Sequence, residues 1–226
     1  MRRHAGTAAA AALLTVSYGA APAYATGDQT VVRIQHDAPL HATPGGTVLR
    51  AAGAPIYERG SAWVVRRRGD WLQIPSVQRR SGALGWVRKT SSQRLTSTRM
   101  RIRVDLSDRR MWVMDGTRRV MSAPVAIGAQ RTPSPVGSTS VSGRIAVTPS
   151  SAYSARAYGP VIVALRMWQS RPSPGMPFGG VMAFHGGADE GSVGTAISAG
   201  CFRMRNADVL RLARIVRAGT PVIVSR

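Results

Sequence analysis

The stretch from His185 to Arg205, HGGADEGSVGTAISAGCFRMR, constrains this chain more than any other part of its sequence. It contains Cys201, the only cysteine, and His185, the only histidine after His41. Cysteine attacks as the thiolate, and a free thiol is little ionised at neutral pH, so a nucleophilic cysteine needs a base such as imidazole. We therefore predict that the fold brings His185 and Cys201 together. The alternative is an inert buried thiol and a structural histidine, both of which are common.

The residues around Cys201 suit a reactive thiol. Gly200 stands directly before it, where a residue without a side chain lets a substrate approach the backbone closely. Arg203 follows two positions later, where its guanidinium can hold an anion. An apolar run ends at Phe184, so we expect His185 to emerge from the end of a strand.

The spacing of these residues resembles the active-site signature of the L,D-transpeptidases of the YkuD type, which are cysteine enzymes of bacterial cell walls. The resemblance rests on residues at fixed offsets: His185, Gly186, Gly194, Ser198, Gly200, Cys201, Arg203, Met204 and Asn206. A T-P-x-P-x-G loop, found here at residues 132–137, is also typical of that family. Many members carry histidine where this chain has Ala199, and this departure leaves the nucleophile and the base in place.

The resemblance implies a reaction for the pair. Cys201 attacks the carbonyl that links meso-diaminopimelate to the terminal D-alanine of a peptidoglycan tetrapeptide stem, and His185 acts as general base and then as general acid. A second stem amine takes the acyl group from the thioester, which remodels or cross-links the wall. Four further residues are assigned to substrate binding, to the oxyanion or to the shape of the site: Gly186, Ser198, Gly200 and Arg203. Among them, Arg203 is expected to hold a substrate carboxylate or brace the loop, and the carbonyl of Gly186 or a nearby backbone group to orient the imidazole.

Two alternatives stay open. Water can replace the acceptor amine, which gives an L,D-carboxypeptidase-type hydrolase on the same scaffold, and the sequence does not separate the two reactions. The other alternative is a non-catalytic wall-binding protein with a degenerate site, which Ala199 alone favours. No cofactor is expected, because one histidine and one cysteine in this part of the chain are too few for a zinc site made by the protein.

The N-terminus predicts export from the cytoplasm. Residues 1–25 combine Arg2 and Arg3, an apolar stretch at 8–16 and the small-x-small triplet at 23–25, as a cleaved secretory signal does. The apolar stretch is too short to span a bilayer comfortably, and no later stretch predicts a stable membrane span. We therefore expect a secreted protein associated with the cell wall.

The charge of the chain bears on its partners. The formal net charge is +21, and Lys89 is the only lysine among 31 basic residues. Such a charge attracts polyanions. The arginines are scattered through both halves and the protein is expected to leave the cytoplasm, so no nucleic-acid partner is expected. Peptidoglycan stem peptides and anionic wall polymers are the candidate partners, and a generally solvated basic surface explains the charge equally well.

Residues 30–92 predict a small β-barrel or sandwich, since short apolar strands alternate with turns. The order WVV, GDWLQI and GALGWV resembles a bacterial SH3-like domain, which implies a wall-binding or spacing module. Trp63, Trp71 and Trp86 are predicted core residues, with a ligand groove at an exposed tryptophan as the alternative. The polar residues 89–98 predict a short linker or the entry to the next domain.

Residues 99–226 are predicted to form a β-rich catalytic domain. Alternating polar and apolar residues predict strands at 101–106, 110–114 and 120–127, joined as an antiparallel meander. Another strand is predicted at 143–148. The segment 149–180 is rich in Ser, Pro, Gly and Tyr, and it is a candidate lid or substrate wall whose lining is drawn from Tyr153, Tyr158, Trp168 and Phe178.

A helix is predicted after Cys201. Asn206 is expected as its N-cap and Gly219 as its stop. Its apolar face is expected to consist of Val209, Leu210, Leu212, Ala213 and Val216. A last strand follows at 221–225. The whole chain is therefore expected to be mainly β, with a small SH3-like barrel, an L,D-transpeptidase-type catalytic domain and one clear helix.

Overall fold

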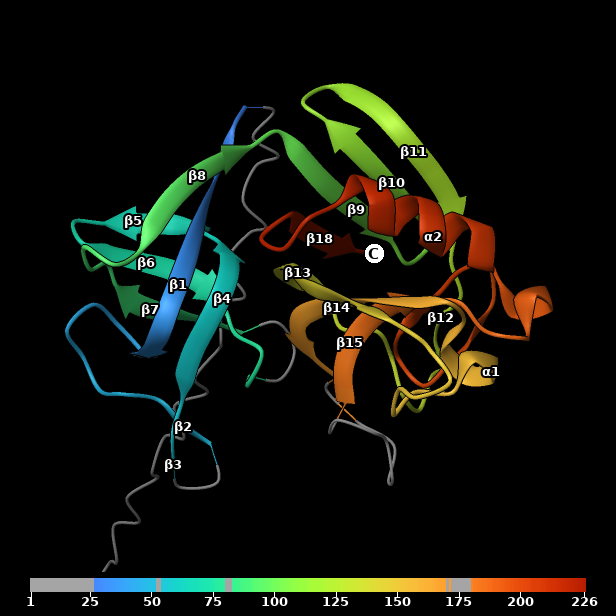
Figure 1. Cartoon of the computed structure of the whole chain (residues 1–226), viewed down its shortest axis with the longest axis horizontal. Helices are drawn as coiled ribbons and strands as arrows, with labels where there is room; N and C mark the ends of the chain where they lie inside the picture. The colour runs from blue at the N-terminus through green and yellow to red at the C-terminus, as the bar shows by residue number, and fades with distance from the viewer. Residues whose placement is uncertain (1–26, 52–53, 80–82, 170, 172–179) are drawn as a thin grey trace, which may run out of the picture.

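The computed structural model describes residues 27–51, 54–79, 83–169, 171 and 180–226. The predicted secretory signal at residues 1–25 lies outside this part. The described chain is mainly β, and its one long helix has ten residues, in agreement with the prediction. Two regions lie side by side, with residues 27–98 on the left and residues 99–226 on the right of Figure 1.

Two three-stranded sheets and a two-stranded pair make up the N-terminal region. The sheets have the orders β4-β1-β8 and β5-β6-β7, and the pair is β2-β3. The strands cover Gln29–Pro39 (β1), Arg50–Ala51 (β2), Ala54–Pro55 (β3), Tyr57–Trp63 (β4), Arg66–Arg68 (β5), Trp71–Pro75 (β6), Leu84–Arg88 (β7) and Arg94–Thr98 (β8). Both sheets contribute to one apolar core, which contains Val32, Ile34, Leu72, Ile74 and Val87.

The prediction of a linker at residues 89–98 is wrong for its second half. Arg94–Thr98 forms β8, which pairs antiparallel with residues 29–33 of β1. Leu95 packs against the core, so one apolar side chain gives this polar strand an inward face. Composition alone hides such a strand because its remaining side chains are polar.

The tryptophans of this region divide into two kinds. Trp63 and Trp86 are buried, as predicted for core residues. Trp71 is only half-buried, and its ring meets the ring of His41 edge-on at 4.9 Å between centroids. One of the three therefore keeps part of its surface accessible.

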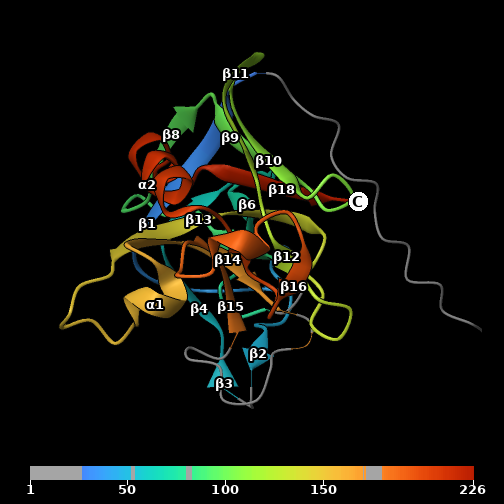
Figure 2. The same cartoon turned by 90° about the vertical axis from the view of Figure 1, so that its right-hand side faces the viewer.

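Eight strands form the sheet of the C-terminal region, in the order β11-β10-β9-β18-β13-β14-β15-β17. They cover Met100–Asp105 (β9), Arg110–Asp115 (β10), Arg118–Pro124 (β11), Gly137–Ala146 (β13), Val161–Trp168 (β14), Val181–His185 (β15), Phe202–Arg203 (β17) and Pro221–Ser225 (β18). Ile127–Gly128 (β12) and Ala196–Ser198 (β16) form a separate parallel pair, visible in Figure 2.

The predicted meander is present, because β9, β10 and β11 pair antiparallel in chain order. Its last strand is shorter than the predicted 120–127. β11 ends at Pro124, which has no N–H to continue the ladder, and residues 127–128 pair with β16 instead. β13 begins at Gly137 rather than at residue 143, and its first residues pair with β18.

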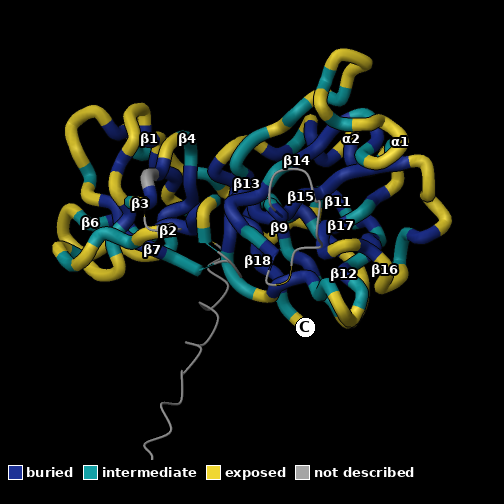
Figure 3. Tube along the Cα trace, turned by 90° about the horizontal axis from the view of Figure 1, so that it is seen from below, coloured by how far each residue is buried: buried dark blue, intermediate teal, exposed yellow. Residues whose placement is uncertain are grey.

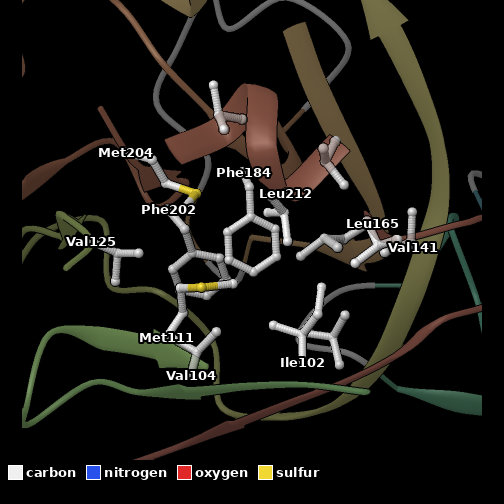
Figure 4. Packing of buried hydrophobic residues seen from close by; sticks show 14 of the residues in the cluster. Ile102, Val104, Met111, Val125, Val141, Leu165, Phe184, Phe202, Met204 and Leu212 are labelled. Atoms are coloured by element: carbon white, nitrogen blue, oxygen red, sulfur yellow. The ribbon is translucent and has the colours of Figure 1, made fainter. Parts of the chain in front are cut away.

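The helix α2 covers Asn206–Ile215 and lies over the sheet, and it shares one core with β15 and β17. Figure 4 shows Leu212 in this core with Phe184 and Phe202. Leu210 was predicted on the same face, but it is 38% exposed. At about 100° per residue, Leu210 falls on the flank of the apolar stripe rather than at its centre. The elements bounded within the described residues include two short helical segments, Ala155–Tyr158 (α1) and Glu190–Ser192 (η2).

The ends of α2 also differ from the prediction. Arg205 occupies the N-cap position, and Asn206 is the first helical residue because its side-chain amide bonds Gly187 instead. The helix ends at Ile215, before Gly219, which lies in the turn that leads into β18.

A buried ion pair joins the two regions. Arg166 of β14 and Glu58 of β4 pair their charges, with 2% and 0% of their side chains exposed. Arg166 also donates from Nε to the carbonyl of Pro75 at 3.1 Å and from Nη1 to that of Arg59 at 3.1 Å. The hydroxyl of Ser76 donates to the Glu58 carboxylate. The contact therefore has a full set of hydrogen bonds, as buried charges require.

Candidate active site

The pairing of β15 with β17 determines where the residues of the signature point. The two strands run parallel, with Phe184 opposite Phe202 and His185 opposite Arg203. Both phenylalanines lie in the main core, with ring centroids 5.0 Å apart. Because side chains alternate along a strand, His185 and Arg203 face the other side of the sheet.

Cys201 precedes β17 by one residue and lies on this second side too. It packs in a small apolar cluster with Ala183 and Ile162. His185 and Ala183 are two residues apart on β15, so the register sets the imidazole and the thiol on one face, in diagonal positions of neighbouring strands. Both residues are buried, with 5% of His185 and 7% of Cys201 exposed to solvent.

The imidazole of His185 is held by the backbone that follows it. Its Nδ1 lies 2.7 Å from the carbonyl oxygen of Gly186. A carbonyl can only accept, so Nδ1 carries the proton and Nε2 keeps a free lone pair. The ring of Tyr158 packs against it at 5.0 Å between centroids. Burial lowers the pKa of His185 from 6.5 to about 4, the Gly186 carbonyl opposes this shift, and the charge of Arg203 adds to it.

The thiol of Cys201 is also kept uncharged. Burial raises its pKa from 9.0 to about 11, while the backbone of Ala183 and the charge of Arg203 act in the opposite direction. Its Sγ lies 3.9 Å from the carbonyl oxygen of Val181. At neutral pH the resting site therefore holds a neutral thiol and a neutral imidazole.

Two buried hydroxyls hold the turn that leads to Cys201. Ser198 Oγ donates to the carbonyl of Cys201 at 2.6 Å and accepts from the N–H of Gly200 at 3.0 Å. Ser134, from the loop at residues 132–137, donates to the carbonyl of Gly200 at 2.6 Å. The prolines of this loop make it recognisable in the sequence. The hydrogen bond from Ser134 to Gly200 joins residues 66 positions apart, so no local sequence pattern predicts it.

Gln169 supports the same turn from the end of β14. Its side-chain amide donates to the carbonyl of Ala199, and 1% of the residue is exposed. Gly200 has a φ of +121°, and a Cβ there would collide with the side chain of Gln169, so this position requires glycine. Sequence reasoning missed Gln169, because nothing near it in the sequence signals a functional role.

Asn206 fixes the other side of the site. Its Oδ1 accepts from the N–H of Gly187 at 3.0 Å, and its Nδ2 donates to the Gly187 carbonyl at 3.2 Å. A Cβ on Gly186 would collide with Asn206 Oδ1. Gly186 thus lies close against the amide, with its carbonyl turned to His185.

Arg203 lies beside the pair at the edge of a cavity. Its Nη1 donates to Asp189 Oδ2 at 3.2 Å and to Ser192 Oγ at 3.0 Å. The cavity has a volume of about 370 Å³, and its lining consists of Arg156, Ala157, Gly187, Ala188, Asp189 and Arg203. This lining carries two guanidinium groups and one carboxylate, so it has a net positive charge.

A second cavity is formed by the segment between β13 and α1. Residues 147–149 and 151–155 line its volume of about 400 Å³. Tyr153 borders this cavity and packs against Tyr158 at 5.3 Å between ring centroids. Trp168 ends β14 and is half-buried, and Phe178 lies outside the described residues. Among the described residues, no three His, Cys, Asp or Glu side chains gather into a group that could hold a metal ion.

Known proteins resemble the C-terminal region in sequence. The family model of the YkuD L,D-transpeptidase catalytic domain matches residues 99–224. A putative L,D-transpeptidase YkuD of Bacillus licheniformis is 31% identical over 133 residues, which are 55% of this chain and 65% of that protein. The putative L,D-transpeptidase YkuD of Bacillus subtilis is 42% identical over 62 residues, which are 24% of this chain and 38% of that protein. The chain thus matches less than two thirds of the length of either relative.

Solved structures are more distant. An L,D-transpeptidase from Mycobacterium smegmatis is 16% identical, with a TM-score of 0.43 over 64% of this chain and 74% of that chain.

Proposed function

Since the chain belongs to the YkuD family of L,D-transpeptidase catalytic domains, we propose that it is a cysteine L,D-transpeptidase of the bacterial cell wall. Its donor is a peptidoglycan tetrapeptide stem. Cys201 displaces the terminal D-alanine and forms a thioester with the diaminopimelate carbonyl, and the amine of a second stem then takes the acyl group. The register that sets His185 and Cys201 on one face of β15 and β17 is the observation that carries the proposal.

The proton moves between two neutral groups in this mechanism. Nε2 of His185 accepts the thiol proton as Sγ attacks, because Nδ1–H is committed to Gly186. The imidazolium then gives the proton to the departing amine of D-alanine. Since burial disfavours both charged forms before the substrate binds, proton transfer accompanies the attack rather than preceding it.

The negative charge on the tetrahedral oxygen needs a backbone donor. The N–H of Gly200 is already bonded to Ser198, so the proposal assigns this contact to the N–H of Cys201. Ser198 acts in the proposal by holding the turn, since its hydroxyl is used within it. Gly186 orients the base through its carbonyl.

Arg203 binds a carboxylate of the stem in this proposal. It lines the positively charged cavity next to His185, and a guanidinium matches the geometry of a carboxylate. Its bond to Asp189 is on the exposed side of the site, where 63% of the Asp189 side chain is accessible. A bound carboxylate therefore competes for Arg203 without breaking a buried ion pair.

We also propose that the protein is exported and that its N-terminal region binds the cell wall. The predicted signal at residues 1–25 supports export, and residues 30–92 act as the SH3-like module that precedes the catalytic domain at 99–226. Within the described residues, no helix has the length and apolar character needed to cross a membrane. Anionic wall polymers are proposed partners of the basic surface.

The test is to incubate the purified protein with a disaccharide tetrapeptide and to weigh the products. We expect free D-alanine and a cross-linked dimer whose mass is two tetrapeptides less one D-alanine. The Cys201→Ala variant should yield neither, while Leu210→Ala, on the exposed flank of α2, serves as the control and should retain both.

Three results would contradict the proposal in different ways. Tripeptide without dimer identifies the hydrolase alternative. No product from a folded wild-type protein supports a non-catalytic wall-binding protein. Product from folded Cys201→Ala shows that another group is the nucleophile.

A further inference from the structure

The sheet β5-β6-β7 presents a basic and aromatic face away from the core of the N-terminal region. Its register sets Arg68 opposite Trp71, and Trp71 opposite Arg88, so these three side chains form one row across the strands. The neighbouring row, Arg67, Leu72 and Val87, points to the other side. There Leu72 and Val87 are fully buried in the core. The row with Trp71 therefore faces outward.

A second outward row extends this face. Arg66 lies opposite Gln73, which lies opposite Trp86, and His41 forms a bridge with Trp86. Trp86 is buried, but the arginines at 66, 68 and 88 are exposed and Trp71 is half-buried. We call the side chains of Arg66, Arg68, Trp71 and Arg88 the outer face.

The charges of the outer face are all positive. Arg68 and Arg88 are the partners of Trp71, Arg66 lies in the next row, and the two rows contain no acidic residue. Arg68 and Arg88 flank Trp71 on either side, each about 5 Å away along the sheet, as neighbouring strands are. Such a surface attracts anions, while the indole offers a flat apolar platform between them.

We propose that the outer face binds an anionic polysaccharide, a chain of sugar rings that carries phosphate or carboxylate groups. One sugar ring packs its C–H groups on Trp71, and the arginines at 66, 68 and 88 hold anionic groups on either side. This site deepens the wall-polymer part of the proposed function and is separate from its catalytic part, because β5, β6 and β7 belong to the N-terminal region and β15 and β17 to the C-terminal region (Figure 3). It holds whether or not Cys201 is a nucleophile.

Sugar and charge together favour this ligand over other polyanions. A site that recognises charge alone requires only the arginines. A site for a neutral glycan requires only the tryptophan. The register joins both in one row, which fits a ligand with both features.

The binding test uses the full chain and three probes measured by calorimetry at two salt concentrations. The probes are wall teichoic acid for phosphate, polygalacturonate for carboxylate and dextran as the uncharged glycan. We expect binding to at least one anionic probe and none to dextran, with weaker binding at higher salt.

Variants locate the site. Arg68→Gln/Arg88→Gln should weaken binding by about tenfold or more, because two charge-assisted contacts are lost. Arg119→Gln/Arg214→Gln removes the same charge from exposed positions elsewhere and should leave most of the affinity. Trp71→Ala should weaken binding by about tenfold. If thermal melting shows that this variant is unfolded, Trp71→Leu replaces it, because leucine keeps an apolar side chain but offers no flat ring.

The proposal is wrong if the two arginine pairs weaken binding equally, because the charge then acts without a site. It is also wrong if folded Trp71 variants bind as the wild type does, or if a single-stranded oligonucleotide binds as tightly as the anionic glycans. D-alanine release from soluble tetrapeptide should be unchanged in all these variants, which separates this test from that of the catalytic mechanism.

Discussion

Two pairs of buried ionisable side chains can be compared within the described residues: Glu58 and Arg166 at the contact between the regions, and His185 and Cys201 at the candidate active site. All four residues are less than 10% exposed. At the contact, two opposite charges are paired and surrounded by hydrogen bonds. At the candidate site, His185 lies against the carbonyl of Gly186 and Cys201 against the backbone of Val181 and Ala183, and the pKa shifts of both groups favour their uncharged forms.

The two pairs differ in how their buried charges are compensated. Burial raises the pKa of Glu58 and lowers that of Arg166, but each also has the other's charge to oppose the shift. His185 and Cys201 have only the single positive charge of Arg203 nearby, and it favours the thiolate while opposing the imidazolium. Any charge that forms on His185 or Cys201 therefore has to be stabilised by a bound ligand or by the backbone.

The largest effect is expected from breaking the contact between the regions. Arg166→Met leaves the Glu58 carboxylate buried without its partner, and we expect a loss of about 3–5 kcal/mol in the free energy of unfolding at pH 8. The loss should be smaller at pH 5, because a carboxyl with a raised pKa takes up a proton there. Urea denaturation at the two pH values measures both.

The double variant Glu58→Gln/Arg166→Met is the control for the unpaired charge. It should recover much of the stability, since no ion is left buried. A loss below about 1 kcal/mol in the single variant, typical of an exposed pair, would contradict the buried contact.

The next effect concerns the neutral imidazole. The pKa of His185 is lowered to about 4, so between pH 6.5 and pH 4 the unfolded chain binds a proton that the folded chain does not. The resulting stability is complete above pH 6.5 and is lost as the pH falls to 4, by about 3 kcal/mol. The difference in unfolding free energy between wild type and His185→Gln should show this slope.

His36→Gln is the control for replacing a histidine, because His36 is exposed and lies in the N-terminal region. Equal slopes in wild type and His185→Gln would mean that His185 titrates normally in the folded protein.

The smallest effect concerns the thiol. With its pKa raised from 9.0 to about 11, Cys201 should have about 100-fold less thiolate than an ordinary cysteine below pH 9. The rate of alkylation by iodoacetamide should therefore still rise between pH 9 and pH 10. The same protein in urea should level off near its ordinary pKa. A rate that is already constant from pH 6 to pH 8 would instead reveal a preformed thiolate–imidazolium pair.

Local sequence patterns predict much of this fold. The meander formed by β9, β10 and β11 follows from alternating polar and apolar residues. The position of His185 at the end of a strand follows from the apolar run that stops at Phe184. The final strand at Pro221–Ser225 follows in the same way. In these elements the local alternation or run of apolar residues is sufficient to predict a strand.

Features that depend on distant residues were missed. β8 appeared to be a linker because its pairing partner lies at residues 29–33. Asn206 is predicted as an N-cap because local sequence does not reveal its bond to Gly187, 19 positions away. Gln169, Ser134 and the Glu58–Arg166 pair were not found for the same reason, since each acts on backbone or charge contributed by another part of the fold.

The position of Arg166 within β14 has a mechanical consequence. Three residues after it comes Gln169, whose amide holds the carbonyl of Ala199 two residues before the thiol. The ion pair that joins the two regions therefore lies three residues, along one strand, from the side chain that holds the turn before Cys201. A displacement of the N-terminal region that moves Glu58 acts on the same strand end that shapes this turn.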